Sequence, residues 1–152
     1  MLKIVALISC MMFTGTFAGT CQSGWIKFKT SCYFGYPYAM YTYAEAQTTC
    51  EGMRANLAVV NDAEENLFLK QYTQNIYHIW IGYNDLDVEG SWEWEDGSKA
   101  SYTNWNVGEP NNAGAIEDCA HFWSTLDGKW NDYPCTTRMG FVCERKTRDS
   151  DV

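Results

Sequence analysis

The sequence predicts a single α+β domain in which two helices precede a small antiparallel sheet that carries a long acidic loop region. Three observations support this prediction. The 152 residues fit one domain with one hydrophobic core. The first half has two helix starts, one with capping-box spacing and one followed by apolar residues at helical spacing, and the second half consists of short strand patterns and loops.

Each expected element follows from a local pattern. Short strands at 25–28 and 32–34 flank a turn. The spacing of Thr42 and Glu45 predicts a capping box that opens a helix ending near residue 54, and a short strand at 55–60 follows. Asn61 with Glu64 predicts the start of a second helix, which ends near residue 74. Further strands are expected at 78–83, 91–95, 119–124, 129–132 and 140–145.

The first 18 residues are expected to be a secretory signal peptide. Lys3 supplies a positive start, residues 4–13 are apolar, and the small-x-small sequence ending at Ala18 is typical of a cleavage site. The alternative is a membrane anchor, but the apolar stretch is about half of the roughly 20 residues that a spanning helix needs. We therefore expect a secreted, extracellular domain at 19–146 without membrane insertion, followed by a polar tail at 147–152.

The cysteines agree with an oxidising compartment. One of the seven lies in the expected signal peptide, which leaves Cys21, Cys32, Cys50, Cys119, Cys135 and Cys143. An even number in a secreted chain indicates three disulfide bonds, although counting alone leaves the pairing open. A cysteine–histidine metal site is disfavoured because the chain has no Cys-x-x-Cys pair and only two histidines.

Negative charge is concentrated in one part of the sequence. The net charge is −8, and 11 acidic but only two basic residues lie between Asp85 and Asp132. The same segment is rich in Trp, Tyr and Gly, so it is not a disordered acidic tail. A solvated acidic surface is the simplest explanation, and a bound cation is the more specific one. Nucleic acid is disfavoured as a partner because its phosphates are neutralised by Lys and Arg.

Oxygen-bearing side chains gather in and after the irregular segment 104–116. Three short clusters together supply three carboxylates and two carboxamides, from Glu109, Asn111, Glu117, Asn131 and Asp132. Calcium takes roughly six to eight oxygen ligands of this kind. An Asn that gives calcium its oxygen keeps two N–H donors, and a Glu keeps a second acceptor oxygen. A ligand with two adjacent hydroxyl groups can therefore bind metal and protein together.

With these residues the chain resembles the C-type lectin-like domain, in its long form with six cysteines. The resemblance covers residues 21–145 and is carried by the cysteine positions, Trp80-Ile81-Gly82-Tyr83, Glu109-Pro110-Asn111 and Trp130-Asn131-Asp132. It implies the C-type lectin-like fold, a cis peptide bond before Pro110, and the disulfides Cys21–Cys32, Cys50–Cys143 and Cys119–Cys135. It also implies that Glu109, Asn111, Glu117, Asn131 and Asp132 bind a principal calcium ion and the carbohydrate.

The resemblance further implies an accessory calcium site. The matching positions are Asp85, Glu89, Asn112 and Asp118. Asn112 departs from the aspartate common at its position, and one carboxylate fewer should weaken this site.

The function implied by the resemblance is calcium-dependent glycan binding. Glu-Pro-Asn goes with mannose, glucose, fucose and N-acetylglucosamine, so we expect a mannose-type lectin of innate immunity that recognises microbial or cell-surface glycans. The alternatives are a non-sugar ligand such as ice, mineral or protein, and galactose binding despite this motif. An enzyme is disfavoured because nothing resembles a nucleophile with its base. One shallow site binds a sugar weakly, which suggests a homo-oligomer. His121 and Trp123 flank the site in sequence; we interpret them as structural residues, with sugar contact as the alternative.

Overall fold

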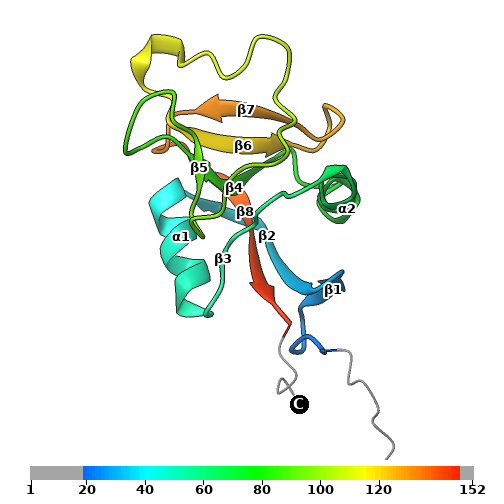
Figure 1. Cartoon of the computed structure of the whole chain (residues 1–152). Helices are drawn as coiled ribbons and strands as arrows, with labels where there is room; N and C mark the ends of the chain where they lie inside the picture. The colour runs from blue at the N-terminus through cyan, green and yellow to red at the C-terminus, as the bar shows by residue number, and fades with distance from the viewer. Residues whose placement is uncertain (1–18, 148–152) are drawn as a thin grey trace, which may run out of the picture.

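The computed structural model describes residues 19–147 and confirms the α+β fold class. The expected signal peptide and all but the first residue of the expected tail lie outside this range. Within it, two helices lie beside one mixed sheet, and a long loop runs over the end of the sheet formed by β6 and β7 (Figure 1). No helix among these residues is long and apolar enough to span a membrane.

The sheet has eight strands, with the order β1-β2-β8-β4-β6-β7, while β3 pairs with β8 and β5 with β4. The strands are β1 Ile26–Phe28, β2 Ser31–Tyr41, β3 Asn56–Leu57, β4 His78–Asn84, β5 Glu93–Trp94, β6 Cys119–Trp123, β7 Lys129–Tyr133 and β8 Met139–Lys146. The expectation of a purely antiparallel sheet is wrong for one pair, because β8 runs parallel to β4. β8 enters between β2 and β4, and its antiparallel pairing with β2 fixes its direction.

The two helices begin close to where the sequence predicts. Helix α1 spans Tyr43–Gly52 and has the predicted capping box between Thr42 and Glu45. Helix α2 spans Ala63–Tyr72, but its N-cap is Asp62, one residue later than predicted. A carboxylate oxygen of Asp62 accepts the two amide N–H groups of residues 64 and 65, both at 2.9 Å, whereas Asn61 donates to the Glu65 carboxylate.

Two expected strands are shorter than their sequence patterns. The strand expected at 55–60 is reduced to β3, although the backbone of Ala58 still donates to Val142 at 2.8 Å. The strand expected at 91–95 is reduced to β5. Its alternation of apolar and acidic residues arises mainly from packing, since Trp94 is buried and Trp92 packs edge-on against Trp105.

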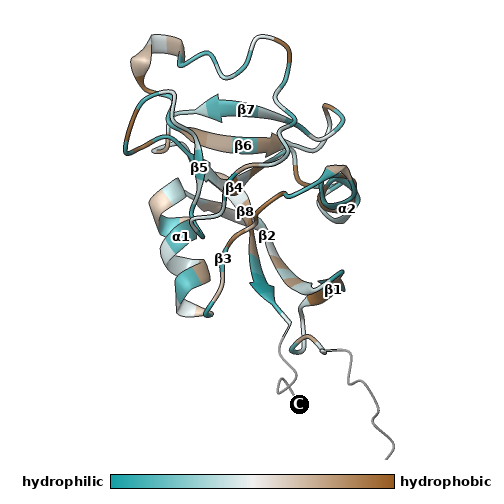
Figure 2. Cartoon of the chain, viewed as in Figure 1, coloured by the Kyte–Doolittle hydropathy of each residue, from teal (hydrophilic) through white to brown (hydrophobic). Residues whose placement is uncertain are grey.

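Apolar residues fill two clusters, one associated with each helix. Leu69 of α2 packs with Ile79, Ile81 and Phe122 of the sheet. The cluster that includes α1 residues contains, among others, Tyr43, Ala46, Leu57, Trp80 and Phe141. In Figure 2 β6 has the pale brown of moderately apolar residues, whereas β7 at the edge of the sheet is largely hydrophilic.

The two ends of the described chain lie together, away from the long loop (Figure 1). The backbone N–H of Thr147 donates to Thr30 at 2.8 Å beside the β1–β2 turn. The structure contains the disulfides Cys21–Cys32, Cys50–Cys143 and Cys119–Cys135. The second of these joins α1 to β8.

Candidate functional site

The long loop is attached to β7 at its start. Trp105 forms an isolated bridge with Trp130, and the N–H of Asn106 donates to the Trp130 carbonyl at 2.8 Å. The chain then passes through the cis bond between Glu109 and Pro110 and returns to the sheet at β6. The motif Glu109-Pro110-Asn111 therefore lies above the strand that carries Asn131 and Asp132.

Asp132 holds the backbone that follows the cis bond. Its side chain is fully buried, and its two carboxylate oxygens accept the backbone N–H groups of Asn111 at 3.1 Å and Asn112 at 2.6 Å. Hydrogen bonds to a charged acceptor are stronger than those between neutral groups. The loop is thus fixed by its backbone, and the Asn111 residue remains exposed to solvent.

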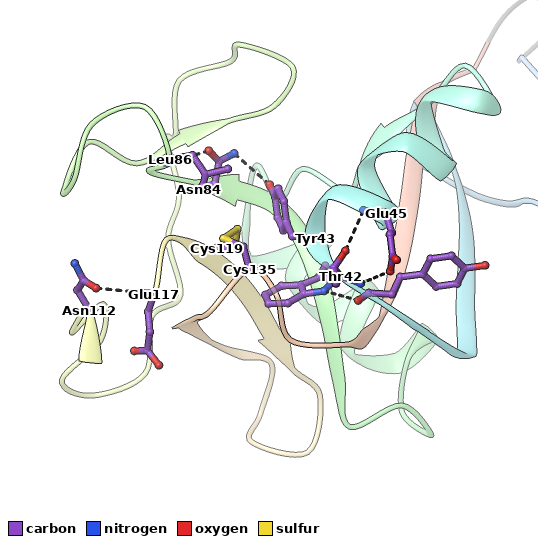
Figure 3. Close-up of a disulfide and its surroundings, with 11 residues drawn as sticks. Thr42, Tyr43, Glu45, Asn84, Leu86, Asn112, Glu117, Cys119 and Cys135 are labelled. Atoms are coloured by element: carbon purple, nitrogen blue, oxygen red, sulfur yellow. Dashed lines mark hydrogen bonds between the residues drawn. A yellow bond between two sulfur atoms is a disulfide. The ribbon is translucent and has the colours of Figure 1, made fainter. Parts of the chain in front are cut away.

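Two hydrogen bonds that involve Glu117 and Asn112 hold the tip of the loop. The Glu117 carboxylate accepts the N–H of Ala113 at 2.9 Å, and the N–H of Glu117 donates to the Asn112 side-chain oxygen at 3.1 Å (Figure 3). Asn112 has a φ of 44°, in the left-handed region that Asn tolerates better than most residues. This turn brings Glu117 back towards Asp132.

The three carboxylates of the predicted principal site repel one another. Burial raises the pKa of Glu109, and the neighbouring carboxylates of Asp132 and Glu117 raise it further. Burial, followed by the charge of Asp132, also raises the pKa of Glu117. One oxygen of Glu109, Oε2, is buried and has no hydrogen-bond partner among the described residues. Among residues 19–147, no Lys or Arg forms an ion pair with Glu109, Glu117 or Asp132.

The two carboxamides of the predicted set lie beside these carboxylates. The Asn111 side chain interacts with Glu109, and the Asn131 amide donates to the Asp132 backbone carbonyl. The structure therefore places all five predicted residues in the long loop, its return and the adjoining strand β7.

These side chains do not form a finished metal cage. Among residues 19–147, no three His, Cys, Asp or Glu side chains are arranged to hold a metal ion. Their chemistry nevertheless fits a hard divalent cation, because one buried carboxylate oxygen of Glu109 lacks a partner among residues 19–147 and the neighbouring carboxylates raise the pKa of Glu109. A calcium ion would be held by Glu109, Asn111, Glu117, Asn131 and Asp132.

The predicted accessory residues form a second acidic cluster next to the first. Asp85 is buried, and its Oδ2 accepts the Gly90 N–H at 2.7 Å, whereas its Oδ1 has no partner in the described chain. Burial raises the pKa of Asp85, and the carboxylates of Glu89 and Asp118 add to this. The Asn112 amide donates to Glu89, so Asn112 contacts both clusters.

Two residues that position this second cluster were missed at the level of sequence. Asn84 donates through Nδ2 to the Tyr43 hydroxyl at 3.1 Å and accepts the Leu86 N–H at 3.4 Å (Figure 3). It therefore connects the loop that begins at Asp85 to helix α1. Asn84 directly precedes Asp85, which was the available signal, but its partner is 41 residues away and no local pattern indicates the contact.

The disulfide Cys119–Cys135 connects the strand after Glu117 with the segment after Asp132. Its Cα atoms are 5.3 Å apart. The carbonyl of Cys135 also accepts the backbone N–H of Tyr43 at 2.9 Å, which links this region to the start of α1. The disulfide therefore holds together the two segments that carry the carboxylates of Glu117 and Asp132.

Comparison with known proteins identifies the family. Residues 39–145 match the family model of the lectin C-type domain. A perlucin-like protein from Mytilus galloprovincialis is 42% identical over 129 residues, which are 81% of this chain and 81% of that protein. The chain belongs to the C-type lectin family, whose carbohydrate-binding domains are generally not enzymes.

Solved structures agree with this assignment and show how widely the fold is used. The cow carbohydrate-recognition domain of CD23, crystallised in the presence of a GlcNAc2Man3 oligosaccharide, has a TM-score of 0.80 and 37% identity, covering 86% of this chain and 98% of that one. A calcium-independent type II antifreeze protein has a TM-score of 0.79 and 27% identity, covering 86% and 97%. The fold alone therefore does not decide the ligand.

Proposed function

We propose that this chain is a secreted, calcium-dependent lectin that binds mannose-type sugars through two adjacent hydroxyl groups. The observation that carries the proposal is the arrangement around Asp132. Its carboxylate fixes the backbone of Asn111 and Asn112, while Asn111 stays exposed and one carboxylate oxygen of Glu109 has no partner in the described part of the chain. A sugar diol and a cation are the groups that such a pair of side chains can serve together.

The predicted site supplies both hydrogen-bond acceptors and hydrogen-bond donors for the diol. When bound, calcium supplies positive charge that attracts both hydroxyl oxygens of the diol. The carboxylates of Glu109 and Glu117 accept hydrogen bonds from the hydroxyl groups, and the amides of Asn111 and Asn131 donate hydrogen bonds to the hydroxyl oxygens. This pattern is close to symmetric and suits two equatorial hydroxyls, such as those on carbons 3 and 4 of mannose.

Galactose fits the arrangement less well. Its hydroxyl on carbon 4 is axial, so its ring would have to tilt away from the loop. The loop after the motif is a short 3-10 turn, Ala113–Ala115, with no aromatic side chain to support a tilted ring. We therefore expect mannose to compete better than galactose, and binding of galactose despite Glu-Pro-Asn is the alternative specificity.

A competition experiment tests the proposal. The protein should bind immobilised mannose in calcium and be released by chelator, with free mannose competing better than galactose. The double substitution Glu109→Gln with Asn111→Asp exchanges donor and acceptor at constant charge, so it should keep calcium and weaken mannose. Glu93→Gln, at an exposed position of β5, is the matched control and should leave binding unchanged. Equal or better competition by galactose would refute the specificity.

A non-sugar ligand remains the second candidate because an antifreeze protein shares the fold. A glycan array without calcium-dependent signal, together with ice-growth inhibition or mineral binding by the same protein, would favour that candidate. Microbial or cell-surface glycans, as used in innate immunity, and a homo-oligomer that multiplies weak sites belong to the lectin proposal. The secreted domain at 19–146 is part of the same proposal, and mass analysis of the secreted protein checks cleavage after Ala18.

A further inference from the structure

A hollow of about 570 Å³ lies beside the candidate calcium site, and none of the predicted site residues lines it. Its walls come from β2, the start of β4, the ends of β6 and β7, and the segment leading into β8. They include Met40, Tyr77, His78, Trp123, Tyr133 and Met139. The volume is in the range of small-ligand sites, which runs from about 300 to about 1,000 Å³.

The rings of Tyr77, His78, Trp123 and Tyr133 form an aromatic wall of this hollow, and the buried His121 contacts three of them. The ring centroid of His78 is 5.2 Å from Trp123 and 5.0 Å from His121, and His121 meets the edge of Tyr133 at 5.5 Å. Tyr77 is 69% exposed and Tyr133 is 39% exposed, so two of the lining rings are accessible to solvent. Exposed aromatic faces of this kind gain stability when an apolar surface stacks on them.

The polar groups at the hollow are largely neutral or already paired. Arg138 directs its guanidinium to both carboxylate oxygens of Glu45, at 3.0 Å each. The Nδ1 atoms of His78 and His121 are buried and have no hydrogen-bond partner in the part of the chain that the structure describes. A hollow with little free charge, in a chain of net charge −8, favours an uncharged ligand that presents an apolar face and hydroxyl groups. A pyranose ring has this chemistry.

The hollow is continuous with the candidate calcium site along β7. Tyr133, which lines the hollow, and Asn131, a predicted sugar ligand, are two residues apart in β7, so their side chains point to the same face of the sheet. Asn131 pairs with His121 across β6 and β7, which places the aromatic wall next to the predicted sugar ligands. A glycan held at the calcium site could therefore extend its next ring over this wall.

We propose that the hollow binds the second ring of a neutral oligosaccharide whose terminal ring occupies the calcium site. This inference rests on the proposed lectin function. Trp123 and Tyr77 supply the stacking surfaces. The chain would then select for glycan length and linkage as well as for the terminal sugar.

Calorimetric titration with methyl α-mannoside and with mannotriose tests the proposal. The wild-type protein should bind the trisaccharide more tightly than the monosaccharide. Trp123→Ala and Tyr77→Ala should each lower the affinity for mannotriose by about two- to tenfold and leave the affinity for methyl mannoside unchanged. Trp25→Ala is the control, because Trp25 packs on Phe34, outside the hollow, and should keep the full gain. Circular dichroism confirms that each variant is folded, and Tyr77 provides an exposed position if Trp123→Ala does not fold.

The outcomes distinguish a failure of the second-ring proposal from a failure of the proposed lectin function. Absence of binding to either sugar in calcium contradicts the lectin function itself. Binding of methyl mannoside without any gain for mannotriose, or an equal loss in Trp25→Ala and Trp123→Ala, overturns the hollow alone. Sedimentation that shows self-association lost in Trp123→Ala, with mannotriose binding unchanged, would also overturn it and assign the hollow to a second copy of the chain.

Discussion

Replacing Asp132 tests how the long loop is held, without involving calcium. Asp132 accepts two backbone N–H groups, from Asn111 and Asn112, and its side chain is fully buried. Each hydrogen bond to a charged group contributes about 1.5–3 kcal/mol. Relief of the repulsion with Glu109 offsets part of the loss, so Asp132→Ala should lower the free energy of unfolding by about 3 kcal/mol. Asp132→Asn keeps one acceptor oxygen and should cost roughly half as much.

Urea unfolding in excess chelator measures this change, because chelator removes any contribution of bound calcium. Hydrogen exchange of the Asn111 and Asn112 amides should accelerate in the same variants. Asp87→Ala, at an exposed position outside these contacts, serves as the control. A loss below about 1 kcal/mol in Asp132→Ala, with unchanged exchange, would show that this carboxylate does not hold the loop.

Three further predictions concern stability. Burial, followed by the charge of His78, lowers the pKa of His121 to about 4, so the fold favours the neutral ring. The contribution of neutral His121 to stability is therefore fully present above the unfolded-state pKa of 6.5 and is lost as the pH falls towards 4. In chelator, the free energy of unfolding should fall by about 2 kcal/mol from pH 7 to pH 5, and His121→Phe should remove this fall. Because the pKa of Glu109 is raised in the fold, its ionised form at neutral pH lowers stability. Glu109→Gln should therefore raise the melting temperature in chelator. The same substitution should lower the calcium affinity measured by titration calorimetry. Removing the disulfide between Cys50 and Cys143, which are 93 residues apart, should cost about 4–5 kcal/mol in urea unfolding, and a loss under 2 would contradict the chain-entropy estimate.

Local patterns were sufficient for much of the fold. The capping box at Thr42 depends on contacts within one helical turn, and sequence identifies such contacts reliably. The candidate ligands were also found locally, because Glu109 and Asn111 flank one proline; their role in calcium binding stays a prediction. The parallel pairing of β4 with β8 could not be predicted in this way, because it depends on the path of the whole chain.

The hollow beside β7 was beyond sequence reasoning for the same reason. Its walls come from residues between Pro37 and Gly140 that meet only after the sheet has formed. Trp123 was interpreted as structural because its neighbours in sequence say nothing about its solvent exposure. The contact between Asn84 and Tyr43 likewise joins segments that share no local motif.

The position of the chain ends determines how this domain can be presented. The two ends of the described chain lie at the pole of the molecule opposite the long loop (Figure 1). A surface, a carrier protein or a neighbouring copy joined through either end would leave the loop pointing outward. Copies tethered side by side by their ends would face their loops in one direction, as a planar array of receptors does. Biotin attached at the C-terminus is accordingly the natural choice for immobilisation, because it leaves the long loop, with the candidate calcium site, facing away from the support.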